Sequence, residues 1–256
     1  GPLPGAPKAA ADGAAAMQSV LEGAVADARA LERGGVDGVL VENFGDAPFH
    51  PDDVPKHTVA ATTRAATAVA DATTLPIGIN VLRNDAEAAV SVAAAVDAAF
   101  VRVNVHTGAR VTDQGIVEGR AHETLRLRER LGVDVGIFAD TDVKHSAPLT
   151  PEGYSAESFA DATERGLADA VVASGSGTGA AIDRAALEAV VDERERHGLE
   201  TPVFVGSGVR PETIGDLLAL ADGVIVGTAL KAAGETTAPV DEERVATLVS
   251  RADDCR

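Results

Sequence analysis

Short apolar runs rich in valine and isoleucine recur along the chain, and stretches with helical periodicity separate them. The runs span residues 38–43, 76–80, 100–104, 135–140, 168–174, 202–205 and 223–226. Apolar spacing predicts helices near 17–31, 57–71, 85–97, 116–130, 156–165, 184–197, between the last two runs, and from about 241. Near-continuous apolar strands that alternate with helices are typical of a parallel sheet with helices outside it.

A TIM (β/α)8 barrel fits this pattern better than an open doubly wound sheet. Polar groups or glycine turns end every predicted strand, whereas an open sheet concentrates its site at one switch point. A chain of 256 residues suits one barrel, so we expect a single domain over 1–256. The pattern contains eight helices but only seven strands. We therefore expect the first strand of the barrel to lie before Gly1.

Composition narrows the range of partners. The net charge of −18 argues against nucleic acid and against anionic membranes, which both require a basic surface. No apolar run is long enough to span a bilayer, and we expect a cytoplasmic protein without membrane insertion. The single cysteine, Cys255, excludes an intrachain disulfide and a cysteine metal cluster. The sequence indicates no metal site and identifies no cofactor.

The charged residues are also unevenly chosen. Of the 22 basic residues only Lys8, Lys56, Lys144 and Lys231 are lysines, and aromatic residues make up 3% of the chain. Excess acid, scarce lysine and abundant alanine and threonine resemble proteins of salt-accumulating halophiles. At about 1 M salt the Debye length is roughly 3 Å, so self-repulsion is largely screened. An ordinary acidic protein is the alternative.

Two glycine turns near the C-terminus predict a phosphate site. They follow the last two strands and comprise Gly206, Ser207, Gly208, Gly227 and Thr228. In barrels, the loops after the last two strands commonly bind phosphate through free backbone N–H groups. Alternatively, the glycines only make tight turns between strand and helix.

Polar residues follow the other predicted strands, and buried polar groups are costly unless they have partners. We expect catalytic residues among Glu42, Asn80, Arg102, Asn104, Asp140, Asp142, Lys144 and His145, and ligand-binding residues among Asn43, Arg83, Asn84, Asp85, Gly177 and Thr178. Arg102 would need a carboxylate partner inside the barrel, either Glu42 or Asp140. Structural explanations stay open: Asp85 suits a helix N-cap, and His145 a simple loop position.

Lys144 is our candidate for the central chemical group, held by Asp140 and Asp142. A lysine kept in a chain that otherwise uses arginine suggests a need for a compact or titratable charge. His145 is a nearby candidate for proton transfer. An exposed loop lysine paired with neighbouring aspartates is the alternative.

Longer motifs carry a family resemblance. PLPGAP, GVDGVLVENFGDAPF, GINVLRNDAEAA, FVRVNVHTGARVTDQGIVEGRA, IFADTDVKHSAPL, VGSGV and VGTALK resemble the BtpA/SgcQ family over nearly the whole chain, as a haloarchaeal-type member. The resemblance implies a barrel of the ribulose-phosphate-binding type, and in the family a further strand ending in His-Leu precedes PLPG. Cyanobacterial members are associated with photosystem I biogenesis, and archaeal members are often labelled phosphoribosylanthranilate isomerase.

Two functions follow as hypotheses. The first is an enzyme that performs isomerase, lyase or glycosidic-bond chemistry on a phosphorylated sugar or nucleotide-like metabolite. The isomerase label fits poorly, because enzymes of that activity use a cysteine base and Cys255 lies in the terminal tail. The second hypothesis is a non-catalytic assembly or stability factor. The expected partner is a phosphorylated small molecule, and a homo-oligomer stays open.

Overall fold

A single curled parallel sheet organises the molecule. The computed structural model describes residues 1–143, 145–149, 158–175 and 182–255. Within these residues, seven strands pair in the order β1-β2-β3-β6-β8-β9-β10. They are β1 (Val39–Glu42), β2 (Ile77–Asn80), β3 (Phe100–Val103), β6 (Gly136–Asp140), β8 (Ala170–Ala173), β9 (Val203–Val205) and β10 (Gly223–Val224). Each lies in one of the predicted apolar runs, so the predicted strands are confirmed.

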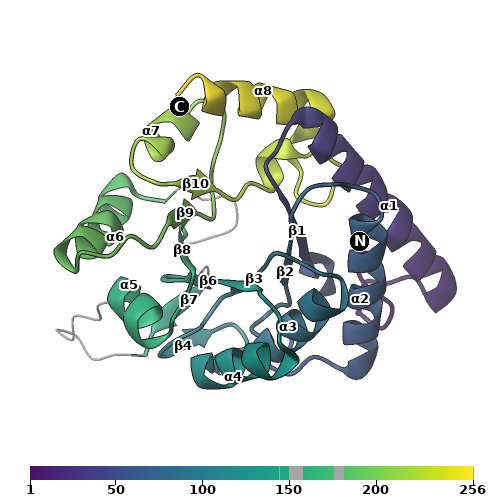
Figure 1. Ribbon diagram of the computed structural model, residues 1–256. Coiled ribbons are helices and arrows are strands. Elements are labelled where there is room, and N and C mark those ends of the chain that lie inside the picture. Colours follow the sequence, from purple (N-terminus) through teal and green to yellow (C-terminus); the bar gives the residue numbers. More distant parts are fainter. Residues whose placement is uncertain (144, 150–157, 176–181, 256) are drawn as a thin grey trace.

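Helices surround this sheet on its outer side (Figure 1). They are α1 (Gly13–Gly34), α2 (Lys56–Ala70), α3 (Ala86–Ala95), α4 (Ala121–Leu131), α5 (Ser158–Ala160) with the π-helical turn η2 (Asp161–Arg165), α6 (Arg184–Arg196), α7 (Ile214–Leu218) and α8 (Glu242–Asp253). Short 3-10 turns, η1 (Phe44–Asp46), η3 (Thr228–Leu230) and η4 (Ala232–Gly234), follow β1 and β10. The α/β TIM-barrel architecture predicted from the alternation is confirmed.

The curled sheet is open along one side. Among the described strands, β1 pairs only with β2, and β10 pairs only with β9. Three of the four residues of β1 are half-buried, whereas every residue of β2 and β8 is buried. A cavity of about 2350 Å³ extends from this gap to the carboxyl ends of the strands. The sequence pattern has one strand fewer than helices, and the structure shows the result: the outer edges of β1 and β10 have no partner among the described strands.

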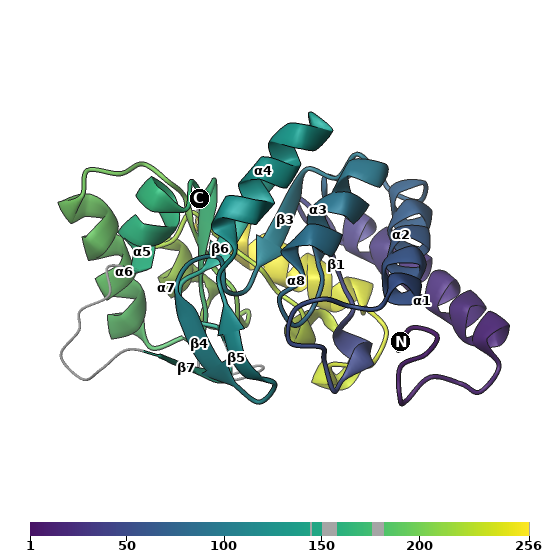
Figure 2. The same cartoon turned by 90° about the horizontal axis from the view of Figure 1, so that it is seen from below.

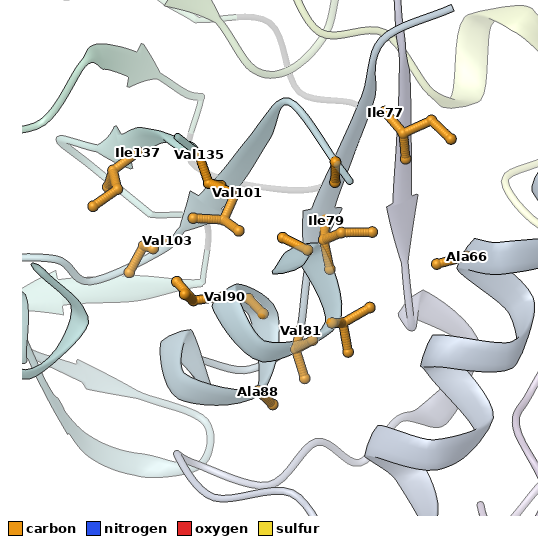
Figure 3. Packing of buried hydrophobic residues seen from close by; sticks show 14 of the residues in the cluster. Ala66, Ile77, Ile79, Val81, Ala88, Val90, Val101, Val103, Val135 and Ile137 are labelled. Atoms are coloured by element: carbon orange, nitrogen blue, oxygen red, sulfur yellow. The ribbon is translucent and has the colours of Figure 1, made fainter. Parts of the chain in front are cut away.

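Alternate residues of each strand pack outward against the helices. Ile79, Val101 and Ile137 point away from the barrel axis into an apolar layer with Val90 of α3 (Figure 3). A second apolar cluster joins β8 and β9 to α5, α6, α7 and α8. Because successive strand residues face opposite sides, the intervening residues point into the barrel.

Three of the six phenylalanines stack inside the barrel, below the polar end. The ring centroids of Phe100 and Phe138 lie 4.4 Å apart, and those of Phe138 and Phe204 lie 5.1 Å apart. Gly78 and Gly223 leave room for this stack, because a Cβ at either position would overlap a phenylalanine ring. The interior thus has an apolar floor beneath its polar layer.

A small antiparallel sheet extends beyond the carboxyl ends of the strands. It consists of β4 (Ala109–Thr112), β5 (Gly115–Glu118) and β7 (Ser146–Pro148), with β4 in the centre (Figure 2). The prediction of a helix starting at residue 116 is wrong at that end, because residues 116–118 pair with β4 and α4 begins at Ala121. Tertiary pairing overrides local periodicity here, since Val117 is buried with Val105 and Val143.

Candidate active site at the mouth of the barrel

Polar residues gather where the parallel strands end, at the end of the barrel that we call the mouth. The set that faces the interior comprises Glu42 of β1, Asn80 of β2, Arg102 of β3, Asn104 just after β3, Asp140 of β6, and Ser174 just after β8. The parallel register of the sheet brings these positions to one level, as in the direct pairing of Glu42 with Asn80. The density of polar groups predicted at the strand ends therefore corresponds to one layer.

A buried ion pair lies at the centre of this layer. Arg102 Nε donates to Asp140 Oδ1 at 2.8 Å, and Arg102 Nη2 donates to Asp140 Oδ2 at 2.9 Å. The side chain of Arg102 is 7% exposed and that of Asp140 is 0% exposed. Burial by itself would lower the pKa of Arg102, but the charge and hydrogen bonds of Asp140 and the charge of Glu42 outweigh it and raise that pKa. The predicted need of Arg102 for an internal carboxylate is met by Asp140.

The neighbouring groups extend this network on both sides. Asn80 Nδ2 donates to Glu42 Oε1 at 2.8 Å, and Asn104 Nδ2 donates to Asp140 Oδ2 at 2.9 Å. Asn104 Oδ1 is buried and has no hydrogen-bond partner among the described residues. Glu42 and Asn104 both line the cavity. A ligand hydroxyl or amide would complete the hydrogen bonding of the Asn104 carbonyl oxygen.

The two glycine turns line the same cavity as Arg102. A Cβ on Gly206 would come within 3.0 Å of Arg102 Nη2 and 2.6 Å of Ser174 Oγ, so packing explains this glycine. Gly208 has a φ of +69° and so needs the freedom of glycine. Ser207 Oγ accepts from Gly175 N at 2.7 Å. At Gly227, in contrast, a Cβ would meet nothing within 4 Å.

Thr228 begins η3, and its hydroxyl lies 3.1 Å from that of Thr236. The second glycine turn therefore leads directly into a short helical turn at the cavity wall. Neither packing against nearby atoms nor a positive φ accounts for Gly227 in this turn.

Three of the residues predicted to bind ligand, Asn43, Asn84 and Asp85, form hydrogen bonds with backbone groups. Asn43 Oδ1 accepts from Leu82 N at 2.7 Å, and Asn84 Oδ1 accepts from Val105 N at 2.7 Å. Asp85 caps α3 by accepting from Ala88 N at 2.8 Å, and its second oxygen accepts from Val54 N. The structural explanation for Asp85 as an N-cap is therefore confirmed. Together these side chains fix the segment after β2, which carries Arg83.

The loop after β6 carries the remaining polar residues that were predicted at the strand ends. Asp142 forms an ion pair with Arg110 of β4, and the side chain of Asp142 is 67% exposed. His145 is exposed, has a φ of +56° and lines the cavity. Lys144 lies outside the described residues, as do Gly177 and Thr178. Because Asp140 and Asp142 already bind arginines, a cluster built on Lys144 would have to share them.

Two polar residues that contact the arginines at the cavity wall were not predicted from the sequence. Ser174 ends the run of β8, and its hydroxyl lies 3.4 Å from Arg102 Nη2. Its position one residue beyond an apolar strand was an available signal. Asp113, in the turn between β4 and β5, lies 3.6 Å from Arg83 Nη2. This contact depends on the small sheet, which periodicity did not predict.

Within the described part of the chain, no helix is long and apolar enough to cross a bilayer. The same residues contain no group of three or more histidine, cysteine, aspartate or glutamate side chains arranged to hold a metal ion.

Comparison with known proteins points to one family. A model of the BtpA family matches residues 1–254. The photosystem I biogenesis protein BtpA of Synechocystis is 44% identical over 234 residues, which cover 91% of this chain and 79% of the relative. An uncharacterized protein of Thermococcus kodakarensis is 46% identical over 242 residues, which cover 94% of this chain and 88% of the relative.

Solved structures resemble the fold at low identity. Phosphoribosyl anthranilate isomerase of Thermus thermophilus aligns over 91% of this chain and 95% of its own, with a TM-score of 0.57 and 16% identity. Thiamine phosphate pyrophosphorylase of Pyrococcus furiosus aligns over 92% of each chain, with a TM-score of 0.60 and 16% identity. At this identity the likeness shows a shared barrel fold and nothing about the reaction.

Proposed function

The chain belongs to the BtpA family, and from its mouth we propose that it is an enzyme acting on a phosphorylated sugar or nucleotide-like metabolite. One observation carries the proposal: the two glycine turns and the polar layer around Arg102 line one cavity at the carboxyl ends of the strands. Barrels of this kind bind phosphate at the last two strands and perform chemistry at neighbouring strand ends. The phosphate would bind backbone N–H groups of the turns that contain Ser207, Gly208, Gly227 and Thr228. The N–H of Gly206 itself donates to Ala173 O at 2.8 Å, so Gly206 shapes the first turn and does not donate to the phosphate.

The polar layer offers distinct chemical roles. Arg102 is a fixed positive charge, and its bond to Asp140 holds the guanidinium for stabilising negative charge that develops on the substrate. Asp140 is therefore a positioning residue. Glu42 is half-buried at the cavity wall and receives a hydrogen bond from Asn80, which suits a carboxylate that accepts a proton from the substrate. Lys144 and His145, from the loop after β6, remain our proposals for a proton donor.

A phosphoribosylanthranilate isomerase reaction is not the one that we propose. Cys255 is exposed, and a Cβ on Gly215 of α7 would lie 2.9 Å from its sulfur, on the helical side of the barrel. A thiol there is remote from the polar layer. Isomerisation, lyase or glycosidic-bond chemistry through Glu42, Arg102 and Lys144 is the reaction class that the mouth supports.

A second candidate function is a non-catalytic assembly factor. The specific observation in its favour is the 44% identity to a relative named for photosystem I biogenesis. In that case the mouth would bind a metabolite as a signal and would not convert it. Conversion of any phosphosugar by the purified protein would favour the enzyme.

Phosphate binding is tested by calorimetry with inorganic phosphate and ribose 5-phosphate in high salt. Gly227→Ala adds a methyl group at an open position of the cavity wall, so we expect at least a tenfold weaker affinity and an unchanged melting temperature. Gly23→Ala in α1 is the matched control, because its Cβ also meets nothing within 4 Å. Gly208→Asp should abolish binding too, but its positive φ also strains the fold. Equal affinities of wild type and Gly227→Ala would place the phosphate site elsewhere.

Catalytic roles are tested by turnover once a converted phosphosugar is found. We expect both Glu42→Gln and Lys144→Arg to lower kcat far more than affinity. Glu42→Gln keeps the size of the group but removes the carboxylate that would accept a proton, and Lys144→Arg keeps the charge but loses the compact, titratable amine. Near-normal kcat in both variants would remove these residues from the mechanism.

The amino-acid composition supports a proposal about the salt concentration in which the protein works. We propose that the protein works in a salt-rich cytoplasm of a haloarchaeal-type organism, because its net charge is −18 and its basic residues are mostly arginines. Its melting temperature should then rise strongly between 0.1 and about 2 M KCl, as screening relieves self-repulsion. We also propose that it forms a homo-oligomer, which sedimentation in the same salt would test.

A further inference from the structure

The segment that carries Arg83 is fixed on several sides. Asn43 accepts from Leu82 N, Asn84 bonds both the N–H and the carbonyl of Val105, and Asp85 caps the helix that follows. The backbone N–H of Arg83 itself donates to His50 O at 2.9 Å. Asn43, Asn84 and Asp85 are each less than a tenth exposed. Hydrogen bonds from buried side chains therefore preset the position of one arginine.

The Arg83 side chain reaches the cavity wall. It is 8% exposed, and its Nη2 lies 3.6 Å from Asp113 Oδ1, which belongs to a side chain 63% exposed. Both residues line the cavity. A charge-assisted hydrogen bond between such groups is usually about 2.7–2.9 Å long, so Asp113 approaches the guanidinium without closing on it. Asp113 Oδ2 also accepts a hydrogen bond from Gln114 Nε2 at 2.6 Å.

The position of Arg83 complements that of the glycine turns. Arg83 follows β2, whereas Gly206–Gly208 follow β9, and Figure 1 shows these two strands across the central space from each other. Arg102 and Asp140 line the same cavity as Arg83 and this glycine turn. A molecule with its phosphate on the glycine turns would therefore extend over the polar layer toward Arg83.

We propose that Arg83 binds a second anionic group of the substrate, so that the substrate class is a small phosphorylated compound with a carboxylate or a second phosphate at its other end. This inference rests on the proposed phosphate site. A guanidinium presents two parallel N–H donors that match either anion. Asp113 is the exposed carboxylate that such a group displaces from Arg83.

Calorimetry with three probes tests the inference: ribose 5-phosphate, 6-phosphogluconate and ribulose 1,5-bisphosphate, at equal ionic strength. We expect the wild type to bind at least one probe with two anionic groups at least tenfold more tightly than ribose 5-phosphate. The second and third probes distinguish a carboxylate from a phosphate as the second anion. Arg83→Gln should remove the preference and leave the affinity for ribose 5-phosphate unchanged.

Asp113→Asn should have the opposite effect on affinity to Arg83→Gln. Asp113 is exposed, so we expect this substitution to leave folding unchanged. Without the competing carboxylate, the favoured probe should bind about threefold more tightly, and ribose 5-phosphate should bind as before. Arg120→Gln, which removes a half-buried arginine paired with Asp52, is the control for loss of one positive charge. Circular dichroism would confirm that Arg83→Gln is folded.

The outcomes separate the two proposals. Binding of ribose 5-phosphate that Gly227→Ala weakens, combined with no preference for either probe with two anions, would overturn the role of Arg83 and leave the phosphate site standing. An unchanged preference in Arg83→Gln, or weaker binding in Asp113→Asn, would also overturn it. If no probe binds the wild type, both proposals fail.

Discussion

At the scale of single residues, the mouth is determined by how each polar group is satisfied. Asp140 is fully committed to Arg102 and Asn104, whereas Asn104 Oδ1 has no partner in the described part of the chain. A polar residue at a strand end therefore predicts a site, but the hydrogen bonds of that residue decide its role in the site. The contrast between Asp140 and Glu42 is the example: both end a strand, and only Asp140 holds the central arginine.

A buried histidine makes a prediction at this scale. His106 is 1% exposed, its Nε2 donates to Gly166 O at 2.7 Å, and its Nδ1 has no partner among the described residues. Burial lowers the pKa of His106, against the opposing effect of the Gly166 carbonyl. The unfolded chain, with a histidine pKa of about 6.5, therefore binds more protons than the folded one. The stability that depends on neutral His106 is complete above that pH and is lost as the pH falls below it.

We expect the melting temperature of the wild type to fall more between pH 7.5 and pH 5.5 than that of His106→Gln. Glutamine keeps an amide donor for the Gly166 carbonyl and does not titrate. The other histidines contribute equally to both proteins, so the difference between the two slopes reports His106. If the melting temperatures of the two proteins fall equally between pH 7.5 and pH 5.5, protonation of His106 does not destabilise the fold.

At the scale of elements, the interior of the barrel depends on pairing large side chains with glycines. Phe100, Phe138 and Phe204 form the apolar floor, and Gly78 of β2 leaves room for the ring of Phe100. Close-packed interiors tolerate little added volume. The stack therefore requires glycine at this position of the neighbouring strand.

Gly78→Ala should destabilise the fold by about 1–3 kcal/mol, the usual cost of overpacking a core. Gly136→Ala in β6 is the matched control, because its Cβ would meet ordinary contacts of 3.6 Å or more. Urea unfolding of the two variants would measure the difference. A Gly136→Ala loss as large as that of Gly78→Ala would show that the phenylalanine stack is not the cause.

At the scale of the whole molecule, the open side of the sheet is the main structural feature. The edges of β1 and β10 face each other across the gap, and α1 and α8 are joined outside it by the ion pair of Arg33 with Glu242. Gly1 and Pro2 lie at the mouth end of β1, because a Cβ on Gly45 would come within 2.8 Å of both. A strand leading into Gly1 would therefore run parallel to β1.

An apolar segment of valine and isoleucine fused in front of Gly1 should raise the melting temperature by several degrees. Its backbone would pair with both exposed edges, which otherwise invite aggregation. A glycine-serine segment of equal length is the control. An unchanged melting temperature with the apolar segment would show that the gap does not accept a strand.

The sequence by itself determined the strands, the surrounding helices and the end of the sheet at which polar residues gather. Apolar runs that end in polar residues or glycines predict buried parallel strands with polar groups at one end. The groups come together because the carboxyl ends of parallel strands meet at one face. The strand count and the family motifs were equally readable. These signals are local in the chain or repeat along it.

Only the tertiary structure decided what each polar residue contacts. The choice of Asp140 over Glu42 as the partner of Arg102, and the use of Asn43, Asn84 and Asp85 to hold backbone, depend on neighbours far apart in the chain. The sheet that brings Asp113 to Arg83 pairs β4 with β7 across more than thirty residues, since Arg110 lies opposite Pro148. Periodicity reports how one segment is buried, and it carries no information about which distant segment covers it.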